Sequence, residues 1–327
     1  MQKKLNLFTH NGPFHADEVF ATAMLSLMAE EINVVRGSDE ELPEDPLNWI
    51  IYDIGGGDLD HHTPENKENN GCHPGTLIPY AACGLVWRRY YKEILAEQGC
   101  PESYYDQVYS RMESSLILGI DAADNGVNPV QEALKEIDLS EEEKKELVFQ
   151  SNTAYTVSDM IRDFNPPWNS TMDYMDAFND AVSFSREIFL NKLDSILSAL
   201  DGTDYVRSCI SYSSEHVLFL DRFAPWEGVL YSLSAYDPKA RDIWYVVFPS
   251  NRGGWNVQCA LRNSDDRTSY RQPLPAAWYG LRYQELSDVC GIEGAVFCHP
   301  SGFLAGARTQ QEAMKMAKLA CKKETRQ

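Results

Sequence analysis

The first 54 residues contain short apolar runs on either side of one amphipathic segment. Leu5–Thr9 has the pattern of a strand, and Ala16–Glu30 has apolar residues every three or four positions, which predicts a helix. Ile32–Arg36 and Trp49–Ile54 are predicted as two further strands, the second apolar on both sides. A strand, a helix and two more strands in this order predict a parallel sheet with flanking helices.

The middle of the chain is predicted to be mainly helical. The periodic apolar positions lie in Pro79–Gln98, Glu102–Ile120, Ser140–Asn152 and Met172–Leu200. Residues 63–78 are polar and rich in Gly and Pro, so we expect a loop there. Asp201 and Gly202 are expected to end the last of these helices.

After residue 200 the apolar runs become short and strand-like. They are Tyr205–Ile210, Val217–Leu220, Val229–Leu233, Ile243–Pro249, Val257–Leu261 and Ala295–Cys298. A final amphipathic helix is predicted at Gln310–Lys322. These elements indicate a smaller α+β domain at the C-terminal end.

A chain of 327 residues exceeds the usual size of a single hydrophobic core, so two domains are expected. We predict an α/β fold in which residues 1–170 form a parallel-sheet catalytic domain that binds metal. Residues 171–200 are predicted to form a long connecting helix. Residues 201–327 are predicted to form the C-terminal substrate-binding domain.

The charge of the chain restricts its partners. Its 29 basic and 49 acidic residues give a formal net charge of −20. Binding to long DNA depends on neutralising many phosphates with Lys and Arg, so this balance argues against a sequence-specific DNA-binding protein. Short nucleic acids, or contacts through bound cations, remain compatible with it.

The sequence also predicts where the protein is found. It has no run of about 18 apolar residues, so we expect no membrane span. The eight cysteines are scattered and contain no C-x-x-C pair, which is typical of reduced thiols. Because the first residues lead directly into a predicted strand without a targeting pattern, we expect a cytoplasmic protein.

Histidine is scarce, yet five of the seven histidines lie in the first 73 residues, mostly beside acidic residues. Four clusters of His and acidic residues emerge along the chain. They contain His10, His15, Asp17 and Glu18; Asp53; Asp60, His61 and His62; and Asp121 and Asp124. His10 and Asp53 are predicted at the carboxyl ends of strands, where binding sites of parallel sheets form.

Metal chemistry explains this mixture of side chains. Imidazole and carboxylate ligands together suit borderline divalent ions, and two ions close together need a bridging carboxylate. Asp53, at the end of a central strand, is the natural bridge. Each cluster alone could be a helix start, a turn or an exposed loop, but their joint occurrence favours a metal centre.

Other catalytic motifs are missing from the sequence. There is no G-x-S-x-G, Walker or G-x-G-x-x-G pattern. In the C-terminal part, Arg252, Gly253, Gly254 and Arg262 could bind an anion, because glycines let backbone N–H groups approach it and Arg binds phosphate. A simple hairpin turn explains these residues equally well.

The clusters, in this order, resemble the DHH phosphoesterase superfamily, which is named for the Asp60-His61-His62 triplet. That superfamily includes RecJ-type exonucleases and family II inorganic pyrophosphatases. The chain is most similar to its Myg (melanocyte proliferating gene) family of metal-dependent hydrolases. The likeness rests on Thr9–Glu18, Asp53 with the triplet, Asp121 to Gly126, Pro273–Arg282 and Phe297–Phe303.

The resemblance implies roles for individual residues. One divalent ion would be bound by His10, His15 and Asp53, and the other by Asp17, Asp53, His61 and Asp124. His62 and Asp60 would be catalytic, with His62 facing the phosphate. His15 departs from the superfamily, which usually has Asp, and this favours Mn²⁺, with Mg²⁺, Co²⁺ and Zn²⁺ as alternatives. Whether Asp121 or Asp124 is the last ligand stays open.

We therefore expect a two-metal phosphoester hydrolase that acts on short RNA in the manner of a 3′–5′ exonuclease. One alternative is a hydrolase of pyrophosphate or of a small phosphorylated metabolite. Another is a protein without activity, in which metal stabilises an interaction surface. The sequence leaves the substrate, the native metal and the oligomeric state open, a homo-oligomer included.

Overall fold

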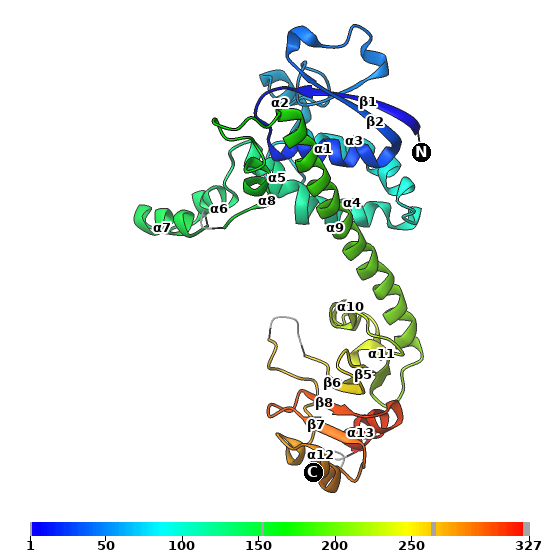
Figure 1. Ribbon diagram of the computed structural model, residues 1–327. Coiled ribbons are helices and arrows are strands. Elements are labelled where there is room, and N and C mark those ends of the chain that lie inside the picture. The colour runs from blue at the N-terminus through cyan, green and yellow to red at the C-terminus, as the bar shows by residue number, and fades with distance from the viewer. Residues whose placement is uncertain (1, 152–153, 263–265, 323–327) are drawn as a thin grey trace. The chain divides into compact units, whose positions relative to one another are not determined.

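The computed structural model describes residues 2–151, 154–262 and 266–322. It divides into two compact units, Met1–Leu197 and Ser198–Gln327, which are considered separately (Figure 1). The predicted α/β class is confirmed: the first unit has a parallel sheet with helices, and the second has a mixed sheet with helices. Among the described residues, no helix is both long enough and apolar enough to cross a membrane.

The sheet of the N-terminal unit is parallel, as predicted, with strand order β2-β1-β3. Its strands are β1 (Gln2–His10), β2 (Ala29–Gly37) and β3 (Ile50–Ile51). β3 is much shorter than the predicted strand Trp49–Ile54, because the chain turns at Asp53, whose φ is 60°. Tyr52 extends the pairing by one bond from its N–H to the Phe8 carbonyl, at 3.1 Å.

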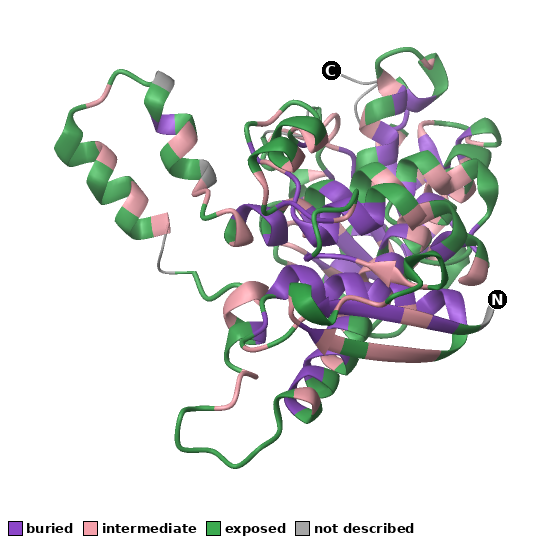
Figure 2. Ribbon diagram, turned by 90° about the horizontal axis from the view of Figure 1, so that it is seen from above, coloured by how far each residue is buried: buried purple, intermediate pink, exposed green. Residues whose placement is uncertain are grey.

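Two helices of this unit pack against each other. Every residue of α1 (Ala16–Leu25) is buried, and α1 packs against α3 (Ala82–Glu97). α1 is shorter than the predicted helix Ala16–Glu30, because residues 26–28 form a 3₁₀ turn and Ala29 begins β2. In contrast to α1, α7 (Glu141–Ser151) contains no buried residue, and it lies at the far left of Figure 2 without any purple.

The helices that follow differ in two places from the prediction. The single helix expected at Glu102–Ile120 is divided into α4 (Tyr105–Met112), a π-helical turn (Glu113–Ile117) and α5 (Leu118–Asp124). The loop expected at residues 63–78 contains α2 (Pro64–Asn70), because the Thr63 side chain caps its first turn. The remaining helices of this part are α6 (Pro129–Ala133) and α8 (Val157–Arg162).

One long helix, α9 (Tyr174–Ser211), begins in the first unit and ends in the second. The predicted end at Gly202 is wrong, and so is the strand expected at Tyr205–Ile210. Val206 and Ile210 are four residues apart and both buried in the core of the second unit, so a helical face explains them as well as a strand does. Asn152, the last residue of the predicted helix Ser140–Asn152, lies outside the described residues.

The sheet of the C-terminal unit has the order β4-β5-β6-β8-β7, and only the β4–β5 pair is parallel. Its strands are β4 (Val217–Phe219), β5 (Tyr245–Pro249), β6 (Trp255–Cys259), β7 (Ala295–Cys298) and β8 (Leu304–Ala307). Its other helices are α10 (Trp226–Ser234), α11 (Pro238–Arg241), α12 (Tyr283–Cys290) and α13 (Gln310–Lys322). α13 has the predicted bounds, whereas the strand expected at Val229–Leu233 is wrong and lies in α10.

Candidate metal centre

Four segments of the N-terminal unit meet at the carboxyl ends of β1 and β3. His10 is the last residue of β1, Asp53 follows β3, and Asp17 lies in the first turn of α1. Eight residues offer ligand atoms that fall into overlapping sets, and the atoms of each set lie within 4.8 Å of one another. These residues are His10, His15, Asp17, Glu18, Asp53, His61, His62 and Asp124. The structure thus brings seven of the residues predicted for the site together with Glu18.

One set of carboxylates surrounds the Nε2 atom of His61. This atom lies 3.1 Å from Asp53 Oδ1, 3.2 Å from Asp124 Oδ2 and 3.6 Å from Asp17 Oδ2. His61, Asp17 and Asp53 are buried, and the Asp124 side chain is 13% exposed. Three carboxylates around one imidazole nitrogen form a donor set suited to a divalent cation.

A second set surrounds Nε2 of His10. This atom lies 3.1 Å from Glu18 Oε1 and 3.3 Å from Asp53 Oδ2, and the His15 ring is 5.9 Å from the His10 ring. Nδ1 of His10 lies 2.9 Å from the Asn11 carbonyl oxygen, which can only accept a hydrogen bond. Nδ1 therefore carries a proton, and a cation that replaces the proton on Nε2 could be bound by the Nε2 lone pair.

Asp53 lies between the two sets. Its Oδ1 faces His61 and its Oδ2 faces His10, so the carboxylate is placed as a bridge. The backbone of Asp53 is in the left-handed region at φ 60°, a conformation that Asp tolerates better than most residues. A hydrogen bond from its N–H to the Leu59 carbonyl, at 3.0 Å, holds this turn. Such strained backbone is often found at functional sites.

The charges of the site fit the binding of cations. Burial raises the pKa of Asp17 well above its usual range, and the nearby carboxylates of Asp53, Asp124 and Glu18 raise it further. Oδ1 of Asp17 is buried and has no N–H or O–H donor among the described residues. Buried carboxylates repel one another and lose hydration, so this arrangement is unfavourable without a compensating positive charge.

The Asp60 side chain faces away from the two sets. Its Oδ2 accepts a hydrogen bond from the Gly56 N–H, at 2.8 Å, and its Oδ1 lies 3.0 Å from the His62 N and 2.8 Å from His62 Nδ1. Burial raises the pKa of Asp60, but these bonds outweigh it and lower the pKa to about 2. Asp60 therefore orients His62, whose side chain is 59% exposed.

Asp121 is not in the cluster. Its carboxylate accepts hydrogen bonds from the N–H groups of Ala81 and Gly84, at 3.0 and 3.1 Å, and lies 2.8 Å from His73. Of the two aspartates on α5, the structure brings only Asp124 to His61. The reason is that Asp121 packs against the first turn of α3, while Asp124 lies in the last turn of α5.

The loop of His10 and His15 is held by two residues to which the sequence assigned no individual role. Glu18 accepts a hydrogen bond from the His15 N–H, at 2.9 and 3.0 Å from its two oxygens, and the three-residue spacing of a capping box is a local signal for it. The Asn165 side chain accepts from the Phe14 N–H and donates to the Phe14 carbonyl, both at 2.8 Å. These partners are 151 residues apart, so no local pattern predicts their contact.

A cavity of about 1040 Å³ lies beside the cluster within the N-terminal unit. The cluster lines part of it, together with two basic side chains from α2 and α8. These lining residues include His15, His61, His62, Asp124, Lys67 and Arg162. A substrate in this cavity would contact the metal-binding residues and these positive charges.

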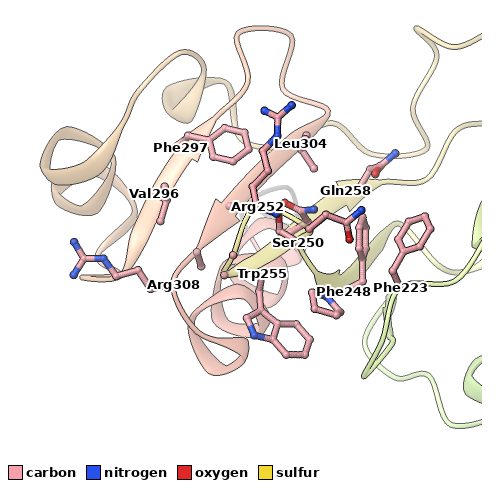
Figure 3. A pocket seen from close by; sticks show the side chains of 17 residues that line it. Phe223, Phe248, Ser250, Arg252, Trp255, Gln258, Val296, Phe297, Leu304 and Arg308 are labelled. Atoms are coloured by element: carbon pink, nitrogen blue, oxygen red, sulfur yellow. The ribbon is translucent and has the colours of Figure 1, made fainter.

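A second cavity, of about 720 Å³, lies in the C-terminal unit (Figure 3). It combines aromatic and basic side chains, which include Phe223, Phe248, Trp255, Phe297, Arg252 and Arg308. Gly253 and Gly254 also line it. Gly254 has φ +73°, and a Cβ there would lie 2.5 Å from the Ala307 carbonyl oxygen, so a larger residue does not fit.

Arg262, predicted to join this anion-binding group, does not line the cavity. Its side chain is exposed, and its Nε donates a hydrogen bond to the Tyr270 carbonyl at 2.9 Å. The chain leaves β6 after Cys259 and pairs Leu261 with Tyr270, which turns Arg262 away. Arg308, which sequence reasoning missed, lines the cavity from the end of β8.

The comparison with known proteins agrees with the motifs along the chain. A family described as "MYG1_exonuc: Uncharacterised protein family (UPF0160)" matches residues 6–321. The chain belongs to this family. Among its relatives, a "MYG1 exonuclease" of Mus musculus is 32% identical over 95% of this chain and 83% of its own length. A "MYG1 protein" of Dictyostelium discoideum is 29% identical over 96% of this chain and 95% of its own.

Among solved structures, a Mn²⁺ complex of RecJ from Thermus thermophilus matches 96% of this chain at 12% identity. The TM-score is 0.25, and the chain spans about half the length of that RecJ chain. At this level the likeness supports no argument about the MYG1-family chain.

Proposed function

We propose that this MYG1-family chain is a metal-dependent phosphoester hydrolase that releases nucleotides from the ends of short RNA, with two divalent cations and a preference for Mn²⁺. The observation that carries the proposal is the convergence of three carboxylates on His61 Nε2, with Asp53 shared by a second set at His10. The relatives named exonucleases support the same class of reaction.

The two sets suggest which residues would hold the cations. His10, His15 and Asp53 would hold one, and Asp17, Asp53, His61 and Asp124 would hold the other. When bound, two such cations lower the pKa of a water molecule so that hydroxide forms near neutral pH. Mixed nitrogen and oxygen ligands suit Mn²⁺, with Mg²⁺, Co²⁺ and Zn²⁺ as alternatives.

The surrounding residues would bind and orient the phosphate. His62, held by Asp60 and exposed beside the cavity, would donate a hydrogen bond to a phosphate oxygen. Lys67 and Arg162 line the same cavity and would attract the phosphate groups of the substrate. Because these charges do not change during the reaction, they would stabilise the negative charge that develops on the phosphate oxygens.

The cavity of the C-terminal unit would bind nucleotides of RNA. Its aromatic side chains offer faces on which bases stack, and Arg252 and Arg308 offer contacts for phosphates. The net charge of −20 disfavours long polyanions, so we propose short, single-stranded RNA. A catalytic domain of residues 1–170, a connecting helix of 171–200 and a substrate-binding domain of 201–327 are part of this proposal, as is a cytoplasmic location.

The direct test incubates the purified chain and Mn²⁺ with a 5′-labelled RNA of about ten nucleotides. We expect stepwise shortening that requires the metal and is lost in Asp124→Asn. Asp58→Asn is the matched control, because Asp58 is exposed in the turn before Asp60 and the same charge is removed. Absence of turnover on RNA, dinucleotides and pyrophosphate would contradict the proposal, and a strong preference for pyrophosphate would contradict its RNA part.

A further inference from the structure

A buried histidine outside the metal centre joins two acidic side chains. His73, in the loop between α2 and α3, is 2% exposed. Its Nδ1 lies 2.7 Å from Glu113 Oε1, and its Nε2 lies 2.8 Å from Asp121 Oδ2. Carboxylate oxygens accept hydrogen bonds, so both ring nitrogens donate and the ring carries a positive charge. We call His73, Glu113 and Asp121 the His73 network.

The network is joined to the first turn of α3. Asp121 Oδ2 also accepts from the Ala81 N–H, and Oδ1 accepts from the Gly84 N–H. A Cβ at position 84 would overlap the Asp121 carboxylate, so glycine permits this close approach. The same turn of α3 reaches the metal centre, because the Ala82 N–H donates to Asp17 Oδ2 at 3.3 Å.

The network also joins the two segments that place His61 and Asp124. Asp121 precedes Asp124 by three residues in α5, so a fixed Asp121 fixes the last turn of that helix. His73 follows α2, whose last residue, Asn70, donates a hydrogen bond to the Asp60 carbonyl at 3.1 Å. His61 Nε2 and Asp124 Oδ2 meet at 3.2 Å only if both segments are held.

We infer that the His73 network is a positioning device for the metal centre: the His73–Asp121 pair holds α3 and α5 so that Asp17 and Asp124 can bind a cation together. This inference rests on the proposed function. Glu113 begins the π-helical turn that divides α4 from α5, and such turns are frequent at functional sites. Residues that orient metal ligands from outside typically change metal affinity when they are replaced.

Two variants test the inference on the full-length protein. In Asp121→Asn, either orientation of the amide turns its NH₂ group towards an N–H donor, so at least one hydrogen bond to α3 or His73 is lost. His73→Gln removes the positive charge and leaves one carboxylate without its donor. Ile94→Ala is the matched control, because it shortens a buried side chain at the other end of α3 and lies outside the network.

The affinity of each variant for Mn²⁺ is measured by calorimetric titration with Mn²⁺ alone. The melting temperature of each variant is measured as well. We expect Mn²⁺ affinity to fall about 10–100-fold in both network variants and to stay within about twofold in Ile94→Ala. A lowered melting temperature with unchanged Mn²⁺ affinity in His73→Gln would overturn the inference. A wild-type chain that binds no Mn²⁺ would instead refute the proposed function.

A second measurement needs no variant. In the wild-type chain, Mn²⁺ should slow hydrogen exchange at the Ala81 and Gly84 amides, which bond to Asp121. Unchanged exchange at both amides under saturating Mn²⁺ would contradict the inference even if Asp121→Asn fails to fold.

Discussion

Replacing Asp53 should remove both cations, whereas replacing Asp124 should remove one. Asp53 places one oxygen 3.1 Å from His61 Nε2 and the other 3.3 Å from His10 Nε2, so it belongs to both ligand sets. Asp124 approaches only the His61 set, at 3.2 Å. Asp53→Asn therefore disrupts both sets, and Asp124→Asn leaves the His10 set intact.

The size of the effect follows from linkage between binding and folding. A ligand at 100 times its dissociation constant stabilises the folded state by about 2.7 kcal/mol. For a unit the size of Met1–Leu197, 1 kcal/mol corresponds to a melting shift of about 2–4 °C. One cation should thus raise the melting temperature by about 5–11 °C, and two cations by about 11–22 °C.

The assay compares melting with excess Mn²⁺ and with a chelator, together with the number of Mn²⁺ ions bound. We expect the full shift in the wild type and in the control Asp58→Asn, about half in Asp124→Asn and almost none in Asp53→Asn. If Asp53→Asn and Asp124→Asn lose the same part of the shift and the same number of ions, then Asp53 is not shared and the bridging arrangement is wrong.

Three further predictions concern other parts of the chain. Gly254→Ala should destabilise the C-terminal unit by about 1–3 kcal/mol in a denaturant titration and weaken RNA binding, because its Cβ would meet the Ala307 carbonyl. Gly253→Ala should destabilise the unit less, by about 1 kcal/mol, because its φ of +90° strains an alanine although nothing lies within 4 Å of its Cβ, and a loss in Gly254→Ala no larger than in Gly253→Ala would contradict the steric argument. Arg308→Ala should weaken the binding of short RNA. It should also make the slope of log binding constant against log salt concentration shallower by about 0.7, and an unchanged slope would exclude a phosphate contact. Burial lowers the pKa of His73, but Asp121 and Glu113 outweigh it and raise that pKa to about 9, so its contribution is complete below pH 6.5 and is lost as the pH rises through 9. Urea unfolding with a chelator should therefore lose up to about 3 kcal/mol of stability between pH 6 and pH 9.5 through His73, and a slope that is as steep in His73→Gln as in the wild type would refute this origin.

The sequence alone determined the residues of the candidate site to a large extent. The motifs from His10 to Asp17, at Asp53 and at the Asp60 triplet carry their own signals, because short stretches of the chain place several ligands side by side. The spacing of apolar residues was also sufficient to predict the bounds of elements with a clear repeat, such as α13. The pattern of apolar residues predicts the local secondary structure when no contact with a distant segment favours another structure.

The choice between Asp121 and Asp124 needed the tertiary structure. A spacing of three residues places both on neighbouring positions of a helix, so sequence cannot separate them. Their neighbours decide: Asp121 meets the amides of α3 and His73, while Asp124 meets His61. Both partners come from segments that are distant in sequence, and the chain brings them together only when it folds.

The remaining differences have the same cause. The residues Tyr205–Ile210 form a helical end, because the core of the second unit buries Val206 and Ile210 on one face of α9. The His10–His15 loop is held by Asn165 from 151 positions away. The sequence therefore determined which residues are present for the chemistry and much of their local structure. Only the tertiary structure decided which of them face one another, because contacts between distant segments leave no pattern in the local sequence.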